Sequence, residues 1–510
     1  MPHRCLGAAP LHSWDSGGPA CVMQPRPRVP LEGPQAHDAR MKQLSAFAAL
    51  VALGSPLVAQ DTALRAELAW RTRALERAWM TTEERALREQ ALPLVEEAVQ
   101  RFFRLDGRGV GENLSAAEAR LRGEEAGPLA GLRLHPAVRL QDAAAPEVEL
   151  VFGWLFGDPS EEELLLEVRC GNQLLEGPST VRLDPEAQAA SWTGRWPEVD
   201  ERALGDLRLE IVVRSGESRA GRSLSFSRVE RLAPRLDGLR AFVEEREQRG
   251  AAPSIEGLTL AARVELLESL AEGSREETDF PAARLLAEAE ALAASLREGA
   301  TWCDRSRRGQ HWWTVPAGRG TAPLRLLVPQ AYDPDQPPPV VVALHGAGGS
   351  ENMFFDSYGD GRIVELCEER GWLLVAPRVS PFGAPVEAIL ESLTERLPFD
   401  AERVLLVGHS MGAGAGQRLL QRAPERYAAF VAMGGGSRVR DAGKLADEPV
   451  LVAAGDRDFG RPGAEALHAS LVAAGSERAR LVIAPACEHL LIVADVLPEA
   501  FDWLDEVLGG

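Results

Sequence analysis

The stretch Arg403-Val-Leu-Leu-Val-Gly-His-Ser-Met-Gly412 decides which fold this chain adopts. Its first five residues read as a short buried strand, and the residues that follow the stretch read as a helix that ends before Pro424. Ser410 therefore stands at a tight strand-to-helix turn, with its hydroxyl exposed for attack. Such a turn strains the backbone and brings the strand and the helix close together, so the flanking positions must be small. The motif consists of Gly408, His409, Ser410, Met411 and Gly412.

A second glycine-rich turn follows the apolar run Val340–Leu344. Acyl transfer passes through a tetrahedral oxyanion, which needs N–H donors that are held in place beforehand. Glycines let the backbone come close to a substrate, and by position the N–H groups of Ala347 and Met411 are the expected donors. A plain glycine turn after a strand is the alternative. The turn consists of His345, Gly346, Ala347, Gly348 and Gly349.

The carboxy-terminal part of the chain alternates strand signals with helix signals. Continuous apolar strands joined by helical crossovers predict an α/β fold, in which helices cover both faces of a mostly parallel sheet. The expected helices are Asp360–Arg370, Val386–Leu397, Met411–Arg422 and Gly463–Ala474. The expected strands are Leu324–Val328, Val340–Leu344, Trp372–Ala376, Val404–Val407, Ala429–Met433, Val450–Ala454 and Leu481–Ala484.

With these motifs, residues from about 310 to 510 resemble the α/β-hydrolase fold. Within that superfamily they are similar to carboxylesterases of the polyhydroxybutyrate-depolymerase, feruloyl-esterase and dienelactone-hydrolase kind. They also resemble the catalytic domain of prolyl-oligopeptidase-type peptidases. The resemblance covers roughly two fifths of the chain, and its motifs separate the members of the superfamily poorly.

The resemblance implies an acid after a later strand and a histidine after the last one. The loop after the sixth expected strand reads Gly455-Asp-Arg-Asp458, and the spacing that is frequent in the family selects Asp458. Asp456 is the alternative, or it simply caps the turn. His489 is the only histidine after the seventh expected strand. The order serine, acid, histidine along the chain is the order that this fold requires.

By this resemblance His489 takes the proton from Ser410 as the serine attacks a carbonyl carbon, and then returns the proton to the leaving group. Asp458 orients the imidazole and stabilises its charged form. Water then cleaves the acyl-enzyme with the help of the same base. This chemistry requires no metal or cofactor. The sequence contains no zinc-ligand spacing, no phosphate-cradling glycine loop and no dinucleotide fingerprint.

One departure from the family concerns the substrate pocket. Many members insert a cap between the strands that correspond to Ala429–Met433 and Val450–Ala454, whereas only 16 residues lie there in this chain. We therefore expect a pocket that is either open or closed by a neighbouring domain. The stretch Met353–Tyr358, after the glycine turn, either lines the acyl side of the pocket or is ordinary packing.

Length and charge exclude several classes of protein. A chain of 510 residues is expected to hold about three domains. Its 26% charged and 45% hydrophobic residues are typical of globular proteins, and argue against a wholly disordered or multi-span membrane protein. With 56 basic and 76 acidic side chains the net charge is -20, so we expect no nucleic-acid partner and no attraction to anionic lipid.

The segment from Met41 to Ala59 has the parts of a secretory signal: Lys42, the apolar run Leu44–Leu53 and a small residue at its end. We expect Met41 to be the true start, Ala59 to be the last residue removed, and the mature protein to be secreted or periplasmic. A short buried helix is the alternative. No other segment approaches 18 continuous apolar residues, so no membrane span is expected in the mature chain.

Three further segments lie between the signal and the hydrolase-like part. Residues 60–130 have helical spacing, 131–230 have short apolar runs divided by turn signals, and 231–304 return to helical spacing. They predict a helical segment, a small β-sandwich-like module and a helical connector, followed by the catalytic domain at 310–510. In the β module, Trp192 and Trp196 are either core aromatics or a platform that contacts carbohydrate.

Four cysteines follow the expected signal peptide. Export would permit disulfides, but four cysteines allow three pairings and the sequence does not choose among them. Small buried apolar side chains are an equally good interpretation. The four are Cys170, Cys303, Cys367 and Cys487.

Three functions from different classes fit these observations. The first is an exported serine hydrolase that cleaves small or polymeric carboxylic esters. The second is a serine peptidase of the prolyl-oligopeptidase type, although the β module is far too short for the large propeller of those enzymes. The third is a polysaccharide- or surface-binding protein with a degenerate hydrolase domain. The complete set of serine, acid, histidine and glycine turns argues against the third.

Overall fold

The computed structural model describes residues 62–157, 163–184, 189–196 and 204–509. The expected signal peptide at 41–59 lies outside these residues, so export stays a prediction. Among the described residues, no helix is long and apolar enough to cross a membrane. The expected bounds of the four segments after the signal also stay predictions.

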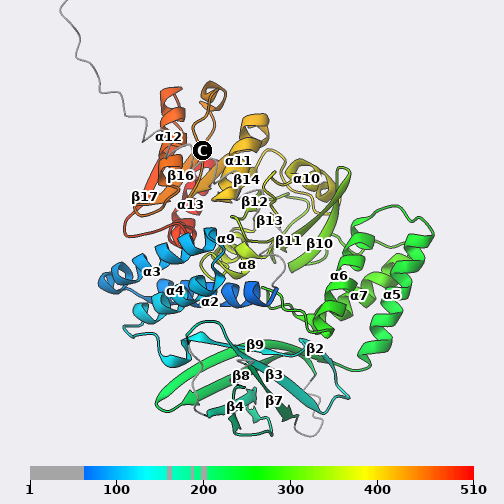
Figure 1. The fold of residues 1–510 in the computed structure, drawn as a ribbon. Coiled ribbons are helices and arrows are strands. Elements are labelled where there is room, and N and C mark those ends of the chain that lie inside the picture. The colour runs from blue at the N-terminus through cyan, green and yellow to red at the C-terminus, as the bar shows by residue number, and fades with distance from the viewer. Residues whose placement is uncertain (1–61, 158–162, 185–188, 197–203, 510) are drawn as a thin grey trace, which may run out of the picture. The chain divides into compact units, whose positions relative to one another are not determined.

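An eight-stranded sheet organises the carboxy-terminal part of the chain (Figure 1). Its strand order is β10-β11-β13-β12-β14-β15-β16-β17. All neighbours from β13 to β17 are parallel, while β11 runs antiparallel to both of its neighbours. This is the strand order of the α/β-hydrolase fold, and it confirms the expected fold class. The strands are β10 (Gly309–Ala317), β11 (Gly320–Val328), β12 (Val340–Leu344), β13 (Leu373–Pro377), β14 (Val404–His409), β15 (Ala429–Met433), β16 (Val450–Gly455) and β17 (Ala479–Ala484).

The strand β10 was missing from the expected strands. It pairs with β11 in register from Gly309 opposite Val328 to Ala317 opposite Gly320, so the two strands form a hairpin. Only alternate side chains of β10 are buried. An edge strand of this kind lacks the continuous apolar run of the central strands, because one of its faces is only partly covered. Local hydrophobicity therefore did not reveal it.

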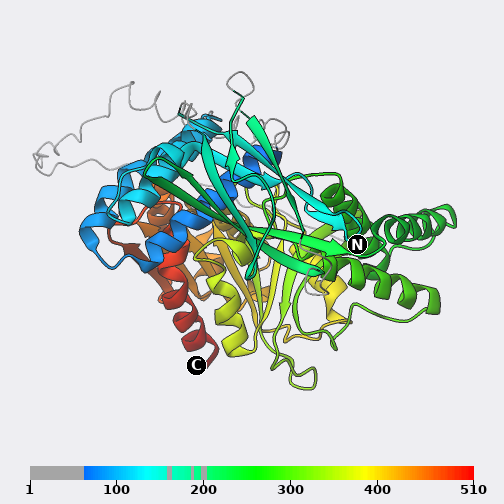
Figure 2. The same ribbon diagram turned by 90° about the horizontal axis from the view of Figure 1, so that it is seen from below.

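Alternate side chains of the central strands enter two separate cores. In β12, Val340 and Val342 face the first core, and Val341 faces the second. Helices α10, α11 and α12 share the first core with α5–α7, while α9 and α13 share the second with α2–α4 (Figures 1 and 2). The helices are α2 (Thr62–Thr81), α3 (Arg85–Phe103), α4 (Gly107–Leu121), α5 (Leu232–Gln248), α6 (Ile255–Ala271), α7 (Ala282–Glu298), α8 (Met353–Asp356), α9 (Arg362–Arg370), α10 (Val386–Thr394), α11 (Met411–Arg422), α12 (Arg461–Ala473) and α13 (Ile492–Gly509).

The β module consists of two sheets around a core of its own. One sheet has the order β1-β3-β7, and the other has the order β2-β9-β8-β4-β5 with β6 paired to β4. Trp192 and Trp196 both belong to that core and are 3% and 5% exposed. Contact of the module with carbohydrate stays a prediction, but these two indoles do not form a platform for it. The strands are β1 (Leu132–Pro136), β2 (Leu140–Asp142), β3 (Glu147–Trp154), β4 (Leu164–Cys170), β5 (Gln173–Leu174), β6 (Thr180–Val181), β7 (Ala189–Arg195), β8 (Gly205–Ser215) and β9 (Ser218–Val229).

A buried ion network ties α2 to the β module. The Glu67 carboxylate accepts hydrogen bonds from Arg71 at 2.8 Å and from Arg222 of β9. Both guanidinium groups also donate to the carbonyl oxygen of Leu132 at 3.1 Å. Because all three charged side chains are at least nine-tenths buried, each needs the others to remain charged. The network therefore fixes the position of α2 against the strands below it.

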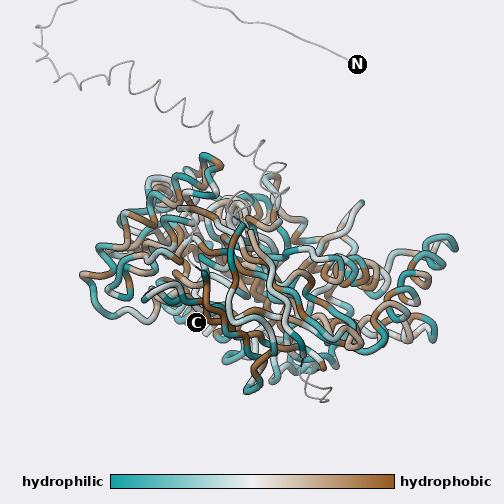
Figure 3. The backbone as a smooth tube through the Cα atoms, turned by 60° about the horizontal axis from the view of Figure 1, so that its bottom comes forward, coloured by the Kyte–Doolittle hydropathy of each residue, from teal (hydrophilic) through white to brown (hydrophobic). Residues whose placement is uncertain are grey.

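Hydrophobic and hydrophilic residues alternate over short distances along the chain (Figure 3). This alternation is typical of helices and strands that bury one face only. The four cysteines of the described residues fit the same picture, because all are free thiols and three of them are buried. They occupy apolar positions and form no disulfide with one another.

Candidate active site

Ser410 occupies the strained turn between β14 and α11. Its backbone angles are φ 53° and ψ -113°, a conformation that costs a residue with a side chain on the order of 1–3 kcal/mol. A Cβ atom at Gly408 would lie 2.6 Å from the carbonyl oxygen of Gly412. A Cβ atom at Gly412 would lie 1.9 Å from the carbonyl oxygen of Leu344. The two flanking glycines are therefore required by space, as expected from the sequence.

The structure brings Ser410, His489 and Asp458 into one chain of hydrogen bonds. The serine Oγ lies 2.9 Å from Nε2 of His489, and Nδ1 of the same ring lies 2.7 Å from Oδ1 of Asp458. With Nδ1 protonated, the ring donates to the carboxylate and accepts from the serine hydroxyl. Asp458 and His489 are 5% and 7% exposed, so water competes little for these contacts.

The environment of Asp458 keeps it ionised. Burial by itself would raise its pKa, but the hydrogen bond and the charge of His489, together with the N–H of Gly460 at 2.6 Å, lower the pKa below the usual value of 3.8. Asp456, the alternative acid, faces elsewhere: its Oδ1 accepts from the backbone N–H of Cys487 at 3.3 Å. Of the two candidates, Asp458 is the one that contacts the imidazole.

His409 and Tyr358 form a second buried layer behind these three residues. The Tyr358 hydroxyl accepts from the backbone N–H of Gly346 at 3.1 Å and lies 2.6 Å from Nδ1 of His409. Nε2 of His409 lies 3.0 Å from the carbonyl oxygen of His489. Burial, followed by the charge of His489, lowers the pKa of His409 to about 3, so the ring is neutral and Nε2–H can donate to that carbonyl. No pattern in the sequence marks Tyr358 for this role.

The glycine turn after β12 lies beside the serine. His345 holds the turn from behind, because its Nδ1 lies 2.8 Å from the carbonyl oxygen of Gly346 and its Nε2 accepts from the N–H of Val379 at 2.8 Å. Among the described residues, neither Ala347 nor Met411 donates its backbone N–H to an acceptor. These two N–H groups are therefore free to bind a ligand oxygen.

A cavity of about 180 Å³ opens at Ser410 and His489. The glycine turn forms one of its sides, together with Met353, Ser357 and Tyr358. Helices α2, α3 and α4 supply most of the remainder, so a segment distant in sequence lines the pocket. Phe354 and Phe355, from the same predicted stretch, pack into the core instead.

A buried carboxyl group precedes His489 in the chain. Glu488 is 1% exposed, and its Oε1 accepts from the N–H groups of Leu490 at 2.8 Å and Leu491 at 3.0 Å. Burial raises the pKa of Glu488 to about 8, against the lowering effect of those two hydrogen bonds. In the described ranges, no group of three or more His, Cys, Asp and Glu side chains could hold a metal ion.

Comparisons with known proteins concern the fold. No family model and no curated protein matches the sequence. Among solved structures, the chain is similar to a thermostable esterase at 14% identity, over 74% of this chain and 97% of that one, with a TM-score of 0.36. It is also similar to an S-formylglutathione hydrolase from Agrobacterium tumefaciens, at 15% identity, over 39% of this chain and 95% of that one, with a TM-score of 0.32. A third similar structure is the feruloyl esterase module from Clostridium thermocellum, at 15% identity, over 38% of this chain and 87% of that one, with a TM-score of 0.31.

We predict that the wild-type protein becomes less stable to unfolding as pH rises, because Glu488 must ionise, and that Glu488→Gln does not show this decrease. A carboxyl group whose pKa is raised on folding stabilises the folded state fully below its unfolded pKa, near 4.5, and this contribution is lost as pH rises towards about 8. The amide keeps the oxygen acceptor and cannot ionise. In thermal and urea unfolding, the free energy of unfolding of the variant should rise relative to that of the wild type between pH 5 and pH 8. The relative increase should be on the order of a few kcal/mol at pH 8.

The exposed Glu499→Gln, on α13, is the control for a change of one surface charge. It should follow the wild-type curve. A gap between Glu488→Gln and the wild type that stays constant from pH 5 to pH 8 would contradict the prediction.

Proposed function

We propose that this protein is a serine hydrolase that cleaves carboxylic esters through an acyl-enzyme intermediate. The observation that supports this best is the hydrogen-bonded chain from Ser410 through His489 to Asp458, at a strained turn that exposes the serine. A nucleophile, a base in contact with it and a group that orients the base are the parts that acyl transfer needs.

In the first step His489 removes the proton from Ser410 while Oγ attacks the carbonyl carbon of the ester. The ionised Asp458 stabilises the imidazolium that forms, because it accepts the hydrogen bond from Nδ1. The negative charge moves to the carbonyl oxygen, for which the N–H groups of Ala347 and Met411 are the proposed donors. The imidazolium then protonates the departing alcohol.

In the second step a water molecule attacks the acyl carbon, with His489 as base, and the acid is released. The arrangement around His409 supports both steps. Its neutral ring bonds to the backbone of His489, while Tyr358 bonds to the backbone of Gly346. One pair of side chains thus links the base to the proposed oxyanion turn, so that neither moves independently of the other.

Esters are preferred over peptides in this proposal because an alcohol is a better leaving group than an amine and needs less assistance. The β module consists of two sheets and contains no propeller in the described residues. It therefore offers no specific support for a prolyl-oligopeptidase-like peptidase. A kinetic panel that pairs p-nitrophenyl esters with aminoacyl amides separates the two activities.

The first prediction is that Ser410→Ala abolishes ester hydrolysis. Loss of the nucleophile should lower kcat for p-nitrophenyl acetate by about 10⁶-fold, to the background that substrate binding and the oxyanion donors provide. Spectrophotometric release of p-nitrophenol measures this, with the exposed Ser306→Ala as control. Full activity in Ser410→Ala would remove Ser410 from the mechanism.

A second prediction separates the two aspartates. Asp458→Asn should lower kcat on the order of 10⁴-fold, because the amide favours the wrong tautomer of His489. Asp456→Asn should change kcat much less, since the Asp456 carboxylate accepts from the backbone N–H of Cys487 and not from the imidazole of His489. The reverse order of the two effects would exchange their roles.

We also propose that the protein is exported, on the basis of the signal-like segment at 41–59. The mature chain should then begin at Gln60. Intact-mass analysis of the protein from a secreting host measures its first residue, and a chain that retains Met41 and remains inside the cell would contradict export.

A further inference from the structure

Helices α2, α3 and α4 supply most of the apolar wall of the cavity at Ser410. They belong to a segment far from the serine in sequence, and no part of the 16 residues between β15 and β16 lines the cavity. Among the lining side chains of these helices, the apolar ones outnumber the polar ones. The apolar lining residues are Leu68, Ala69, Ala98, Val99, Phe102, Phe103, Val110 and Leu114.

Helix α3 contacts both sides of the candidate active site through consecutive aromatic residues. Phe102 packs on the proposed oxyanion turn, since a Cβ atom at Gly348 would lie 2.6 Å from the tip of its ring. Phe103 packs edge-on against Phe459, with ring centroids 5.5 Å apart. Phe459 in turn lies against the imidazole of His489, with centroids 4.0 Å apart. The end of α3 therefore spans the gap between the oxyanion turn and the base.

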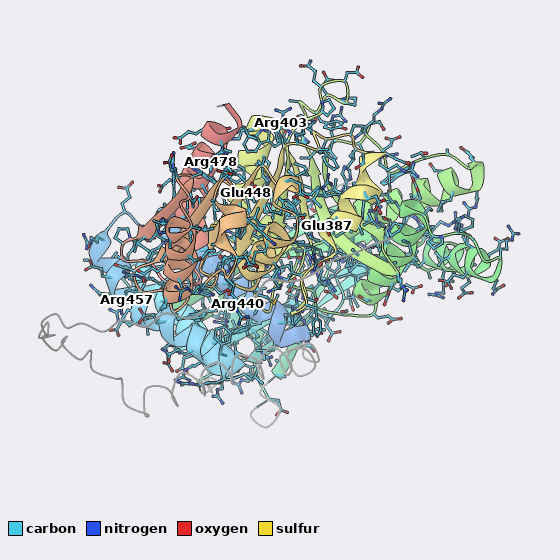
Figure 4. The ribbon with its side chains drawn as sticks, turned by 90° about the horizontal axis from the view of Figure 1, so that it is seen from above. Glu387, Arg403, Arg440, Glu448, Arg457 and Arg478 are labelled. Carbon is cyan, nitrogen blue, oxygen red and sulfur yellow. The ribbon has the colours of Figure 1, made fainter. Side chains whose placement is uncertain are left out.

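Ion pairs hold the helices in this place. Glu96 of α3 pairs with Arg457, next to Asp458, at 2.5 Å (Arg457 is labelled in Figure 4). On α2, the Arg65 guanidinium donates to the carbonyl oxygen of Gly349 at 3.5 Å and pairs with Glu277 at 2.5 Å. The contacts with Arg457 and Gly349 fall on the acid loop and on the glycine turn, the two segments that border the serine, while Glu277 lies between α6 and α7.

Packing reinforces these ion pairs. Leu75 and Trp79 of α2 are completely buried in the core that α2–α4 share with α9 and α13. The indole N–H of Trp79 donates to Asp495 of α13 at 2.9 Å. A segment with its own side chains in that core cannot leave the pocket without exposing apolar surface. The helices are therefore a fixed wall of the pocket.

We propose that α2–α4 form a cap that selects esters carrying an apolar group of several carbons, and that this group lies against α2 and α3. The inference rests on the proposed ester hydrolysis and adds the substrate class to it. The α2 side of the wall also carries Arg65, Thr72 and Arg73, but against the apolar lining residues a sugar-like or charged group would leave its polar atoms without partners, at a cost for each of them. Each methylene that the wall removes from water adds to binding, so selectivity rises with chain length until the cavity is full.

The test measures kcat/KM for p-nitrophenyl acetate, butyrate, hexanoate and octanoate. In the wild type, kcat/KM should rise at least tenfold from acetate to its maximum. Ala69→Phe places a ring in the cavity from α2, and should lower kcat/KM for the preferred ester at least tenfold more than it lowers kcat/KM for acetate. Alkyl acetates with lengthening alcohols form a second series, which distinguishes an acyl-side from an alcohol-side apolar group.

The matched control is Ala86→Phe, which adds the same ring to an exposed position of α3 outside the cavity. In this control, the ratio of kcat/KM for the long esters to kcat/KM for acetate should be the same as in the wild type. A wild type that shows no increase with length in either series overturns the proposal even if Ala69→Phe fails to fold. Equal effects of Ala69→Phe on short and long esters overturn it as well.

A binding measurement keeps this inference separate from the proposed chemistry. By calorimetry, Ser410→Ala should bind octanoate at least tenfold more tightly than acetate, and the added Ala69→Phe should remove the difference. If no ester is hydrolysed but this difference is found, the ester-hydrolase proposal fails and the apolar pocket stands. If esters are hydrolysed and the difference is missing, the cap proposal fails alone.

Discussion

The close approach of α11 to β12 is the constraint on which the candidate site depends. Gly412 lies so near the carbonyl oxygen of Leu344 that no side chain fits between them. This contact holds the start of α11 against the end of β12, and Ser410, directly before α11, has a positive φ of 53°. The serine hydroxyl, the N–H of Met411 and the glycine turn after β12 are consequently presented together at one edge of the sheet. A larger residue at position 412 would separate all three.

The second organising feature is the way in which the chain covers this edge. The sheet has one core on each face, and α2–α4 extend the core that contains α9 and α13. The buried network of Glu67, Arg71 and Arg222 fixes α2 to the β module at the same time. The β module therefore supports the helices that wall the pocket, which gives the amino-terminal part of the chain a structural relation to the site.

Much of the site was accessible to sequence analysis because its constraints are local. Ser410 and its glycines form one short motif whose spacing reflects a single turn, and the strands around it are continuous apolar runs. His489 and Asp458 followed from the resemblance and from chain order, and hydrogen bonds now join them to the serine. The strand β10 was missed because it is a half-covered edge strand. Tyr358 was expected only as a pocket-lining or packing residue, and its hydrogen bonds to Gly346 and His409 were missed, as was Glu488, because nothing in the local sequence marks a buried tyrosine or a buried acid.

The sequence by itself determined the parallel sheet, the strained serine turn and the order of the three triad-type residues, because each is encoded by neighbours or by short periodic patterns. Only the tertiary structure decided that Asp458 rather than Asp456 meets the imidazole, and that the pocket is walled by helices about 300 positions earlier in the chain. These outcomes depend on contacts between segments that are distant in sequence. Such contacts depend on how whole faces of helices and sheets pack together. A local pattern of residues does not determine which of these faces pack against each other.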